Sequence, residues 1–507
     1  MTDVIVESTA GKLRGTTVNA IHKFVGIPYA GPTGGPHRFR PPTTLEPWAG
    51  VRDALQYGNR APQPADGMAG LRAIIGEAQP EPDGEDCLCL NVWTPAVGDE
   101  GRRPVLFWCH GGGFTMGSGS APFYHGTNLA RRGDVVVVTV NHRLGPLGYC
   151  YLGDLAGEAY AESGNVGMLD LVAALEWVRD NIAAFGGDPG NVTIFGESGG
   201  GAKVSVLMAM PAAAGLFHRA IVQSGPGLRM QSRAKATEQA ERLLKALDIS
   251  ARSVDQLSAV TAEQIVAANA RVNSNPLRGW SPVVDGCVLP QHPFDPVAPA
   301  LSAQVPLIIG TNKDEATLFL LADEGLATLD EAELLERVRL LAGEAAMSLI
   351  AAYHQAYPQA APGDLFASLM SDRMMRMHSI TIAERKDTQG AASVFMYLFT
   401  WETPILNGRL KSCHALEIPF VFDNLARGSR FTGESPERFA LAEQMSEAWL
   451  AFARDGVPQY HGLPTWPAYD RETRATMIFD QTCRVENDPG GDLRRAWSSI
   501  PIPSLNE

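Results

Sequence analysis

Short runs of apolar and β-branched residues recur along the chain, and segments with helical spacing separate them. The runs occupy 104–109, 135–140, 192–195, 220–223, 306–310 and 393–399. Apolar residues also recur at every third or fourth position from Val166 to Phe185, which predicts a long amphipathic helix that ends at Gly186 and Gly187. Strands that alternate with helices are joined by crossover connections. The pattern therefore predicts an α/β fold with a largely parallel sheet.

The first hundred residues show a different pattern of predicted elements. Strand-like pieces at 12–15, 24–30, 38–42 and 89–93 alternate with turns that are rich in Gly and Pro. Residues 61–86 contain prolines, glycines and acids but no aromatic residue. We expect that segment to be a surface loop.

Two later segments are rich in helix formers. Residues 230–300 and 320–390 contain much Ala, Leu, Glu and Arg, and we expect helical insertions between sheet strands there. No repeat, low-complexity tract or change of composition marks a linker. Residues 1–507 are therefore predicted to form a single α/β domain.

Composition and charge exclude several classes of function. An apolar content of 45% with 19% charged residues is typical of a soluble globular protein and too apolar for disorder. The net charge of −14 argues against nucleic acid or an anionic membrane surface as a partner. No run approaches the ~20 apolar residues of a membrane span, and the N-terminus lacks the pattern of a signal peptide. The seven cysteines are scattered without a C-x-x-C pair, so free thiols and a cytoplasmic location are expected.

One stretch indicates chemistry. The run at 192–195 leads into Gly196-Glu197-Ser198-Gly199-Gly200, which has the G-x-S-x-G pattern of a nucleophile elbow. A serine on this sharp turn between strand and helix is exposed at the sheet edge, and its neighbours must lack side chains so that the backbones can pass. Ser198 is the candidate nucleophile, and the Gly199 N–H is a candidate donor to an oxyanion.

A serine nucleophile also needs further oxyanion donors. His110-Gly111-Gly112-Gly113 follows the strand at 104–109, as the H-G-G-G loop of lipases and esterases does. Backbone N–H groups can approach a reacting carbonyl closely only where no Cβ intervenes. Gly112, Gly113 and Gly199 are therefore predicted to form a three-donor oxyanion hole.

The base and its carboxylate partner are expected after later strands, in the order acid and then histidine. Asp314 and Glu315 both follow the strand at 306–310, and position does not choose between them. His414 follows the strand at 393–399 and an irregular segment, and it is the preferred base. The other downstream histidines fall in helical or tail segments: His354, His378 and His461.

Several motifs in order show a resemblance to a known family. The segments are 24–30, 85–92, His110 to Phe114, 141–145, 196–200, 223–225, 312–315 and His414 with 417–420. Together they cover nearly the whole chain and resemble the type-B carboxylesterases, α/β-hydrolases that include bacterial para-nitrobenzyl esterases and animal cholinesterases.

The resemblance implies an α/β-hydrolase fold and a role for each motif residue. It assigns Glu315 as the acid of the triad and His414 as its base. It implies a buried polar network of Glu197, Ser224 and Glu417, although ordinary buried hydrogen bonding is an equally good interpretation of those three. No metal or cofactor is implied.

The chain also departs from the family pattern. No cysteine precedes Cys87, so the disulfide of secreted relatives is not possible, and residues 61–86 lack the tryptophan with which cholinesterases stack choline. His142 replaces a more usual tyrosine, and Gly199 replaces a more usual alanine.

The sequence thus predicts a serine esterase for small to medium carboxylic esters that works as a monomer or homodimer. Its alternatives are a lipase, an amide or carbamate hydrolase with the same triad, and a catalytically silent binding protein of the neuroligin type. Trp280, Phe319 and the segment 370–377 are candidate linings of the acyl and alcohol pockets, though core packing is the commoner role of such residues.

Overall fold

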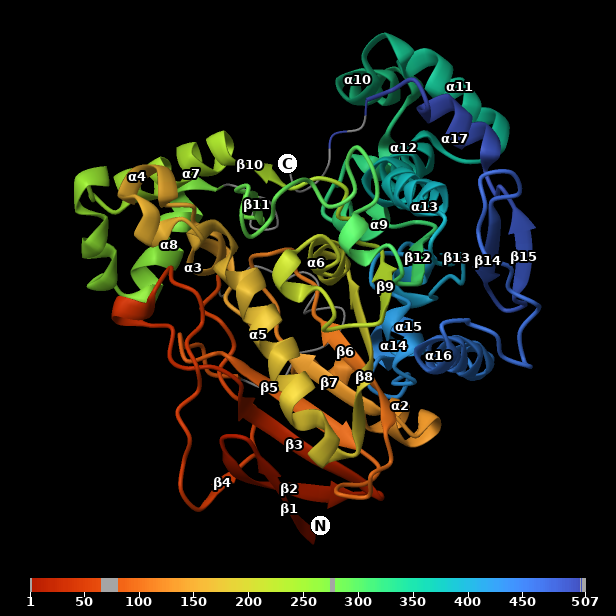
Figure 1. The fold of residues 1–507 in the computed structure, drawn as a ribbon. Coiled ribbons are helices and arrows are strands. Elements are labelled where there is room, and N and C mark those ends of the chain that lie inside the picture. The colour runs from red at the N-terminus through yellow and green to blue at the C-terminus, as the bar shows by residue number, and fades with distance from the viewer. Residues whose placement is uncertain (1, 65–80, 274–278, 502, 504–507) are drawn as a thin grey trace.

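A 13-stranded sheet runs through the part of the chain that the computed structural model describes, residues 2–64, 81–273, 279–501 and 503. Its strand order is β1-β2-β3-β5-β7-β6-β8-β9-β12-β13-β14-β15, and β4 pairs with β2 outside this path. Figure 1 shows the N-terminal strands at the bottom of the view and β14 and β15 at the right.

The N-terminal edge of the sheet is mainly antiparallel. Each of the strands β1, β2, β3, β5 and β7 runs opposite to the next, and only the short β4 pairs in parallel, with β2. The bounds are β1 Thr2–Ser8, β2 Gly11–Val18, β3 Ile21–Pro28, β4 Val51–Asp53 and β5 Cys89–Thr94.

From β7 to β14 every strand is parallel to its neighbour, as the alternating pattern predicts. The bounds are β6 Arg103–Cys109, β7 Val136–Val140, β8 Gly187–Glu197, β9 Arg219–Gln223, β12 Leu307–Asn312, β13 Val394–Phe399 and β14 Ala475–Phe479. The final strand, β15 Arg484–Asn487, is antiparallel to β14.

Alternate residues of the parallel strands supply two different cores. On β6, Val105 and Phe107 belong to one hydrophobic cluster, whereas Leu106 and Trp108 belong to another. Helices cover both faces of such a sheet, so its strands are buried on both sides and are apolar almost without interruption. This explains why the central strands were predictable from apolar runs.

Helices between the strands cover the sheet and form two groups outside it. The bounds are α2 Thr127–Gly133, α3 Gly145–Tyr149, α4 Gly153–Ala156, α5 Val166–Asn181, α6 Gly199–Leu207, α13 Met377–Gln389, α14 Ile418–Val421, α15 Ser429–Thr432, α16 Arg438–Asp455 and α17 Gly491–Trp497. The predicted long helix is α5 with a 3-10 turn, Ile182–Phe185, and it ends at Gly186 with φ +74°.

The segments 230–300 and 320–390, where helical insertions are expected, each contain several helices. The first contains α7 Arg233–Ala246 and α8 Ala262–Val272, and a two-stranded sheet of β10 Gln231–Ser232 and β11 Val283–Val284. The second contains α10 Glu331–Ala342, α11 Ala346–Ala356 and α12 Pro362–Ser371, preceded by the short α9 Ala316–Phe319. The two insertions lie at opposite upper corners of Figure 1. In contrast, α13 contacts β12 and β13 and so covers the sheet.

Two sequence predictions differ from the structure, and two strands were missed. Residues 38–42 form no strand, because Arg38 and Phe39 lie in a turn in which Phe39 has φ +62°; the Arg38 side chain forms an ion pair with Glu85, 2.6 Å between Nη2 and Oε2. Helix α5 is less amphipathic than predicted, because its buried side includes Asp170, which binds Arg143. Most of the predicted loop at 61–86 lies outside the described residues, and β14 and β15 were not predicted.

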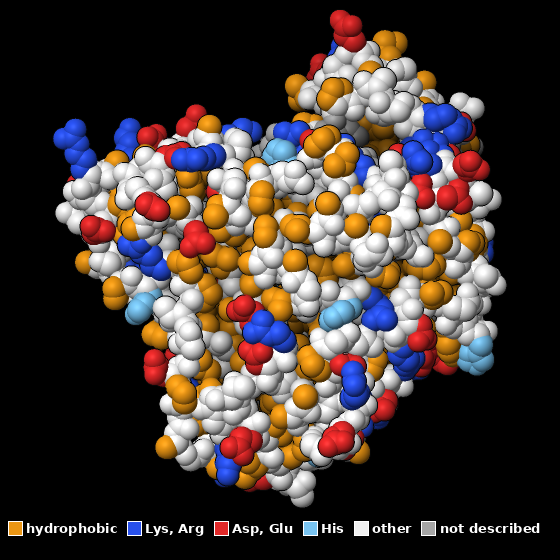
Figure 2. All heavy atoms as spheres, viewed as in Figure 1, with side chains coloured by type: hydrophobic (Ala, Val, Ile, Leu, Met, Phe, Trp, Pro, Cys, Tyr) orange, Lys and Arg blue, Asp and Glu red, His pale blue; other side chains and the backbone are white. Residues whose placement is uncertain are grey.

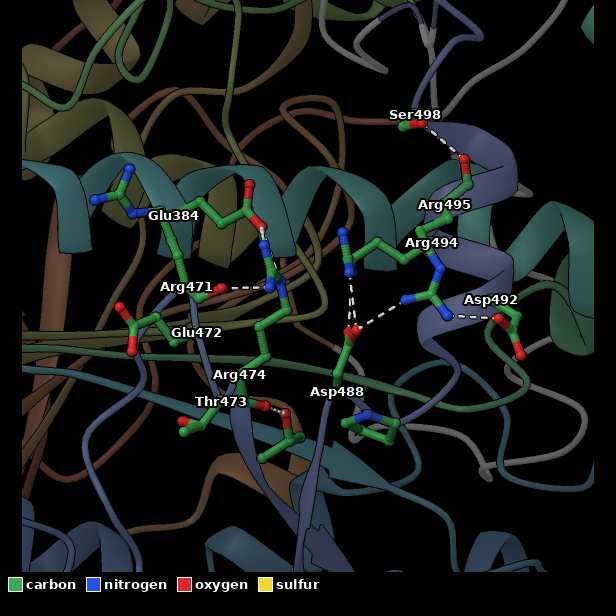
Figure 3. A network of polar contacts seen from close by, with 12 residues as sticks. Glu384, Arg471, Glu472, Thr473, Arg474, Asp488, Asp492, Arg494, Arg495 and Ser498 are labelled. Atoms are coloured by element: carbon green, nitrogen blue, oxygen red, sulfur yellow. Dashed lines mark hydrogen bonds and ion pairs between the residues drawn. The ribbon is translucent and has the colours of Figure 1, made fainter.

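Charged side chains of opposite sign are interspersed on the surface. Figure 2 shows acidic and basic residues mixed over one face, with apolar side chains between them. Near the C-terminus these charges form a network (Figure 3): Asp488 binds Arg494 and Arg495, and Arg474 binds Glu384 of α13. The network connects α17 and the β14–β15 hairpin to the helix that covers β12 and β13.

Candidate active site

Ser198 stands at a sharp turn between β8, which ends at Glu197, and α6, which begins at Gly199. Its φ of +58° and ψ of −125° are costly for a residue with a side chain and persist only where the surroundings enforce them. A Cβ at Gly196 would lie 2.5 Å from the Gly200 carbonyl carbon, and one at Gly200 would lie 2.0 Å from the Cys109 oxygen. The two glycines of the elbow are therefore required sterically.

The loop of predicted oxyanion donors lies directly against this elbow. Gly112 and Gly113 have φ of +87° and +63°, and a Cβ at Gly112 would lie 2.4 Å from the Met116 oxygen. A Cβ at Gly199 would lie 2.2 Å from the Gly113 oxygen, so no alanine fits there without movement. Gly199 and the Gly112-Gly113 pair, which are far apart in sequence, thus come together at the elbow.

His414 and Glu315 meet in a short hydrogen bond. The His414 Nδ1 donates to Glu315 Oε2 at 2.5 Å, and the other carboxylate oxygen accepts the Asn312 backbone N–H at 2.8 Å. Glu315 follows β12 and His414 follows β13, strands that are adjacent in the sheet. Asp314 is turned to the Ser412 backbone N–H instead, at 3.4 Å.

The other candidate histidines have other surroundings. His354 contacts Glu331 at 3.2 Å on the half-exposed side of α11. The His461 ring packs on Tyr460, with ring centroids 4.5 Å apart. His378 is buried on α13.

The second nitrogen of His414 faces the elbow. Its Nε2 lies 3.2 Å from Glu197 Oε1, on the residue that precedes Ser198. Within the described part of the chain, Ser198 Oγ makes no hydrogen bond. Catalytic hydrogen bonds are often long before substrate binds. The arrangement places the imidazole between two carboxylates, Glu315 at Nδ1 and Glu197 at Nε2.

Three buried carboxylates set the electrostatics. Burial raises the pKa of Glu197 well above its usual range, and it also raises the pKa of Glu417. Burial alone would lower the pKa of His414, but the charges of Glu197, Glu315 and Glu417 outweigh it and raise that pKa to about 9. The group as a whole therefore holds protons more tightly than its members would in water.

Two residues that the sequence did not single out hold Glu417 in place. Gln223 Nε2 donates to its Oε1 at 3.1 Å, and Asn312 Nδ2 donates to its Oε2 at 2.8 Å. Asn312 also donates to the Cys413 oxygen at 2.7 Å, which ties the end of β12 to the loop that carries His414. Both residues lie inside recognised motifs, 223–225 and 312–315, and that membership was the available signal.

Ser224 fits the expected polar network less directly. It is fully buried with φ +45°, and its N–H donates to the Gly310 oxygen at 2.9 Å. Among the described residues, no group forms a hydrogen bond with its Oγ. In this structure Ser224 therefore contributes a backbone hydrogen bond after β9, and its hydroxyl contributes none.

The candidate pocket linings separate into two kinds. The Phe319 ring lies 4.9 Å from the His414 ring and is 37% exposed, so it borders the site. Met374 and Met375 pack with Ala316, the residue after Glu315. Trp280 is a core residue of the first insertion, and its Nε1 donates to Asn269 Oδ1 at 2.7 Å.

The described residues contain neither a helix long and apolar enough to span a membrane nor a metal-ligating group of three His, Cys, Asp or Glu side chains. A strained serine between strand and helix, a glycine loop beside it, and a His–Glu pair after later parallel strands define the molecule as an α/β-hydrolase.

Comparison with known proteins specifies the family. The profile of the carboxylesterase family matches residues 2–492. The para-nitrobenzyl esterase of Bacillus subtilis (strain 168) is 38% identical over 507 residues, 98% of each chain. The phenmedipham hydrolase of Pseudarthrobacter oxydans is 35% identical over 499 residues, 96% of this chain and 97% of that protein.

A solved carboxylesterase structure has the same fold as this chain. The Geobacillus stearothermophilus carboxylesterase EST55 superposes with a TM-score of 0.87 at 43% identity, over 97% of this chain and 100% of that chain. The chain therefore belongs to the carboxylesterase family, and it is an enzyme that hydrolyses carboxylic esters. This confirms the family and the fold that the motifs predicted.

Proposed function

We propose that the protein hydrolyses carboxylic esters of small to medium size through an acyl-enzyme on Ser198. The observation that carries the proposal is the His414 ring, held by Glu315 at Nδ1 while Nε2 faces the Ser198 elbow. A serine hydroxyl is a weak nucleophile, and a base fixed in this way is what activates it.

In the first half of the reaction, Ser198 Oγ attacks the ester carbonyl carbon while His414 Nε2 accepts the hydroxyl proton. The carbonyl oxygen becomes an oxyanion that accepts hydrogen bonds from the N–H groups of Gly112, Gly113 and Gly199. The tetrahedral intermediate then collapses, the carbon–oxygen bond to the alcohol breaks, and His414 gives its proton to the leaving alkoxide.

In the second half, water attacks the acyl carbon and gives a proton to His414. The same donors hold the new oxyanion, the bond to Ser198 Oγ breaks, and His414 returns the proton to the serine. Glu315 remains ionised throughout, fixing the imidazole tautomer and stabilising the imidazolium.

The test is hydrolysis of para-nitrophenyl esters from C2 to C12 by the native enzyme and by Ser198→Ala. We expect turnover of short esters below their micellar concentration, and its loss in the folded variant. Activity only on long chains above the micellar threshold would instead indicate a lipase, and undiminished turnover by Ser198→Ala would refute the mechanism.

A further inference from the structure

Lys203 is a fully buried lysine on α6, five residues after Ser198. Its Nζ donates to the backbone oxygen of His110 at 2.8 Å. A lysine is almost never fully buried without a partner, because removing its charge from water is costly. Here the partner is the first residue of the loop that supplies the oxyanion donors.

The face of α6 that carries Lys203 packs on that loop. Gly199 and Lys203 are four residues apart and so lie on one side of the helix, one turn from each other. Gly199 has no room for a Cβ beside Gly113, and Gly200 has none beside Cys109. The loop from Cys109 to Gly113 therefore packs tightly against the first turn of α6. Lys203, on the second turn of α6, forms a hydrogen bond with the same loop.

Burial lowers the pKa of Lys203 to about 7, so near neutral pH this lysine is not a fixed cation. The rings of His110 and His142 stack beside it, with centroids 5.0 Å apart and planes at 22°. Burial, and then the lysine charge, lowers the pKa of both histidines well below the usual range, so both are neutral. The Phe114 ring lies 5.6 Å from Nζ and presents no opposing charge. The contribution of Lys203 to the loop is therefore its hydrogen bond to the His110 oxygen rather than a fixed charge.

We propose that Lys203 is a positioning residue for ester hydrolysis, which fixes the oxyanion loop through its hydrogen bond to the His110 carbonyl. The proposal rests on the function proposed above. Because the loop must be aligned most accurately when the oxyanion forms, the contribution of Lys203 belongs to the transition state more than to substrate binding.

The test compares Lys203→Met with a matched variant of another buried lysine. Lys386 on α13 is equally buried, and its Nζ donates to the backbone oxygens of Ser302 at 2.7 Å and Ala303 at 2.8 Å. Lys386→Met therefore reproduces the loss of a buried lysine from carbonyl acceptors away from the site. Both are measured for melting temperature, kcat and KM on a para-nitrophenyl ester, and for Ki with a trifluoromethyl ketone that mimics the tetrahedral intermediate.

For Lys203→Met we expect kcat to fall about 10- to 100-fold, since a misaligned loop weakens donors that are each worth about 10²–10³ in rate. KM should stay within about twofold and Ki should rise in parallel with the loss in kcat. Lys386→Met should melt earlier but keep its kcat.

A Lys203→Met enzyme that keeps kcat and Ki within twofold of the native values overturns the proposal, as does an equal loss of kcat in Lys386→Met. If Lys203→Met does not fold, Lys203→Gln is assessed by the same criteria. A failure of this proposal can be distinguished from a failure of the proposed function, because labelling of Ser198 in the native enzyme tests the latter separately.

Discussion

Ser198 shows how far single residues determine this site. The glycines on either side of it have no space for a Cβ, so the sequence pattern and the steric requirement coincide. The choice between Asp314 and Glu315 was not available from spacing, because both follow the same strand. Only the turn after β12, which points one carboxylate to His414 and the other to Ser412, separates them.

The pH dependence of the enzyme tests the role of Glu197. Because neutral His414 is the proposed base, kcat/KM should fall as the pH drops through the pKa of His414. Glu197→Gln removes the carboxyl group that lies 3.2 Å from Nε2 and that, when ionised, raises the pKa of His414. The acid limb of the kcat/KM profile should therefore move to lower pH.

Glu417→Gln is the matched control, because Glu417 is the weakest of the three carboxylates that raise the pKa of His414. The acid limb of the kcat/KM profile should move less in Glu417→Gln than in Glu197→Gln. An acid limb that stays in place in Glu197→Gln, or that moves upward, would contradict the electrostatic account.

At the scale of elements, the central strands were predictable and the edges were not. Strands buried on both faces need apolar residues throughout, so their runs are visible in the sequence. The segment 38–42 resembles a strand but is held by a buried Arg38–Glu85 pair, a contact between residues 47 positions apart. β15 was missed because it is a four-residue edge strand made largely of polar, partly exposed residues, whereas β14 is as short and as buried as the predicted β9 and was overlooked.

The buried end of α5 gives a stability prediction. Asp170 is fully buried and accepts hydrogen bonds from the N–H, Nε and Nη2 of Arg143 at 3.0, 2.8 and 2.6 Å. Asp170→Ala leaves the guanidinium buried without its partner, so the free energy of unfolding should fall by about 3–5 kcal/mol. The midpoint of urea unfolding measures the change.

The same helix offers a control. Asp180 pairs with Arg179 at 2.7 Å, but both side chains are about half exposed. Asp180→Ala should cost less than about 1 kcal/mol, because solvent screens exposed pairs. If Asp170→Ala and Asp180→Ala lower the free energy of unfolding equally, burial does not determine how much the Asp170–Arg143 pair stabilises the fold.

At the scale of the whole molecule, the active site joins residues from four distant segments. The loop after β6, the elbow after β8 and the loops after β12 and β13 all meet at one region of the sheet, since the ends of parallel strands lie along one edge. The order of motifs allowed this assembly to be predicted. The roles of Asn312 and Gln223, which donate hydrogen bonds to Glu417, were not predictable, because they depend on how β9, β12 and the His414 loop pack together.

The cysteines give a further prediction for the whole fold. All seven are free thiols, and Cys287 is exposed whereas the other six are buried. Titration with a thiol reagent such as dithionitrobenzoate should therefore label one cysteine rapidly in the native protein and all seven in denaturant. Rapid reaction of several thiols in the native protein would show that the packing around the sheet is looser than described.

The identity of the nucleophile is the central claim, and it can be measured directly. The enzyme is treated with a serine-directed organophosphate, digested, and mapped by tandem mass spectrometry while residual ester hydrolysis is followed. We predict one label per chain, on Ser198, and loss of activity in proportion to labelling. Complete labelling of Ser198 with full remaining activity, or inactivation by a label on another residue, would contradict the account.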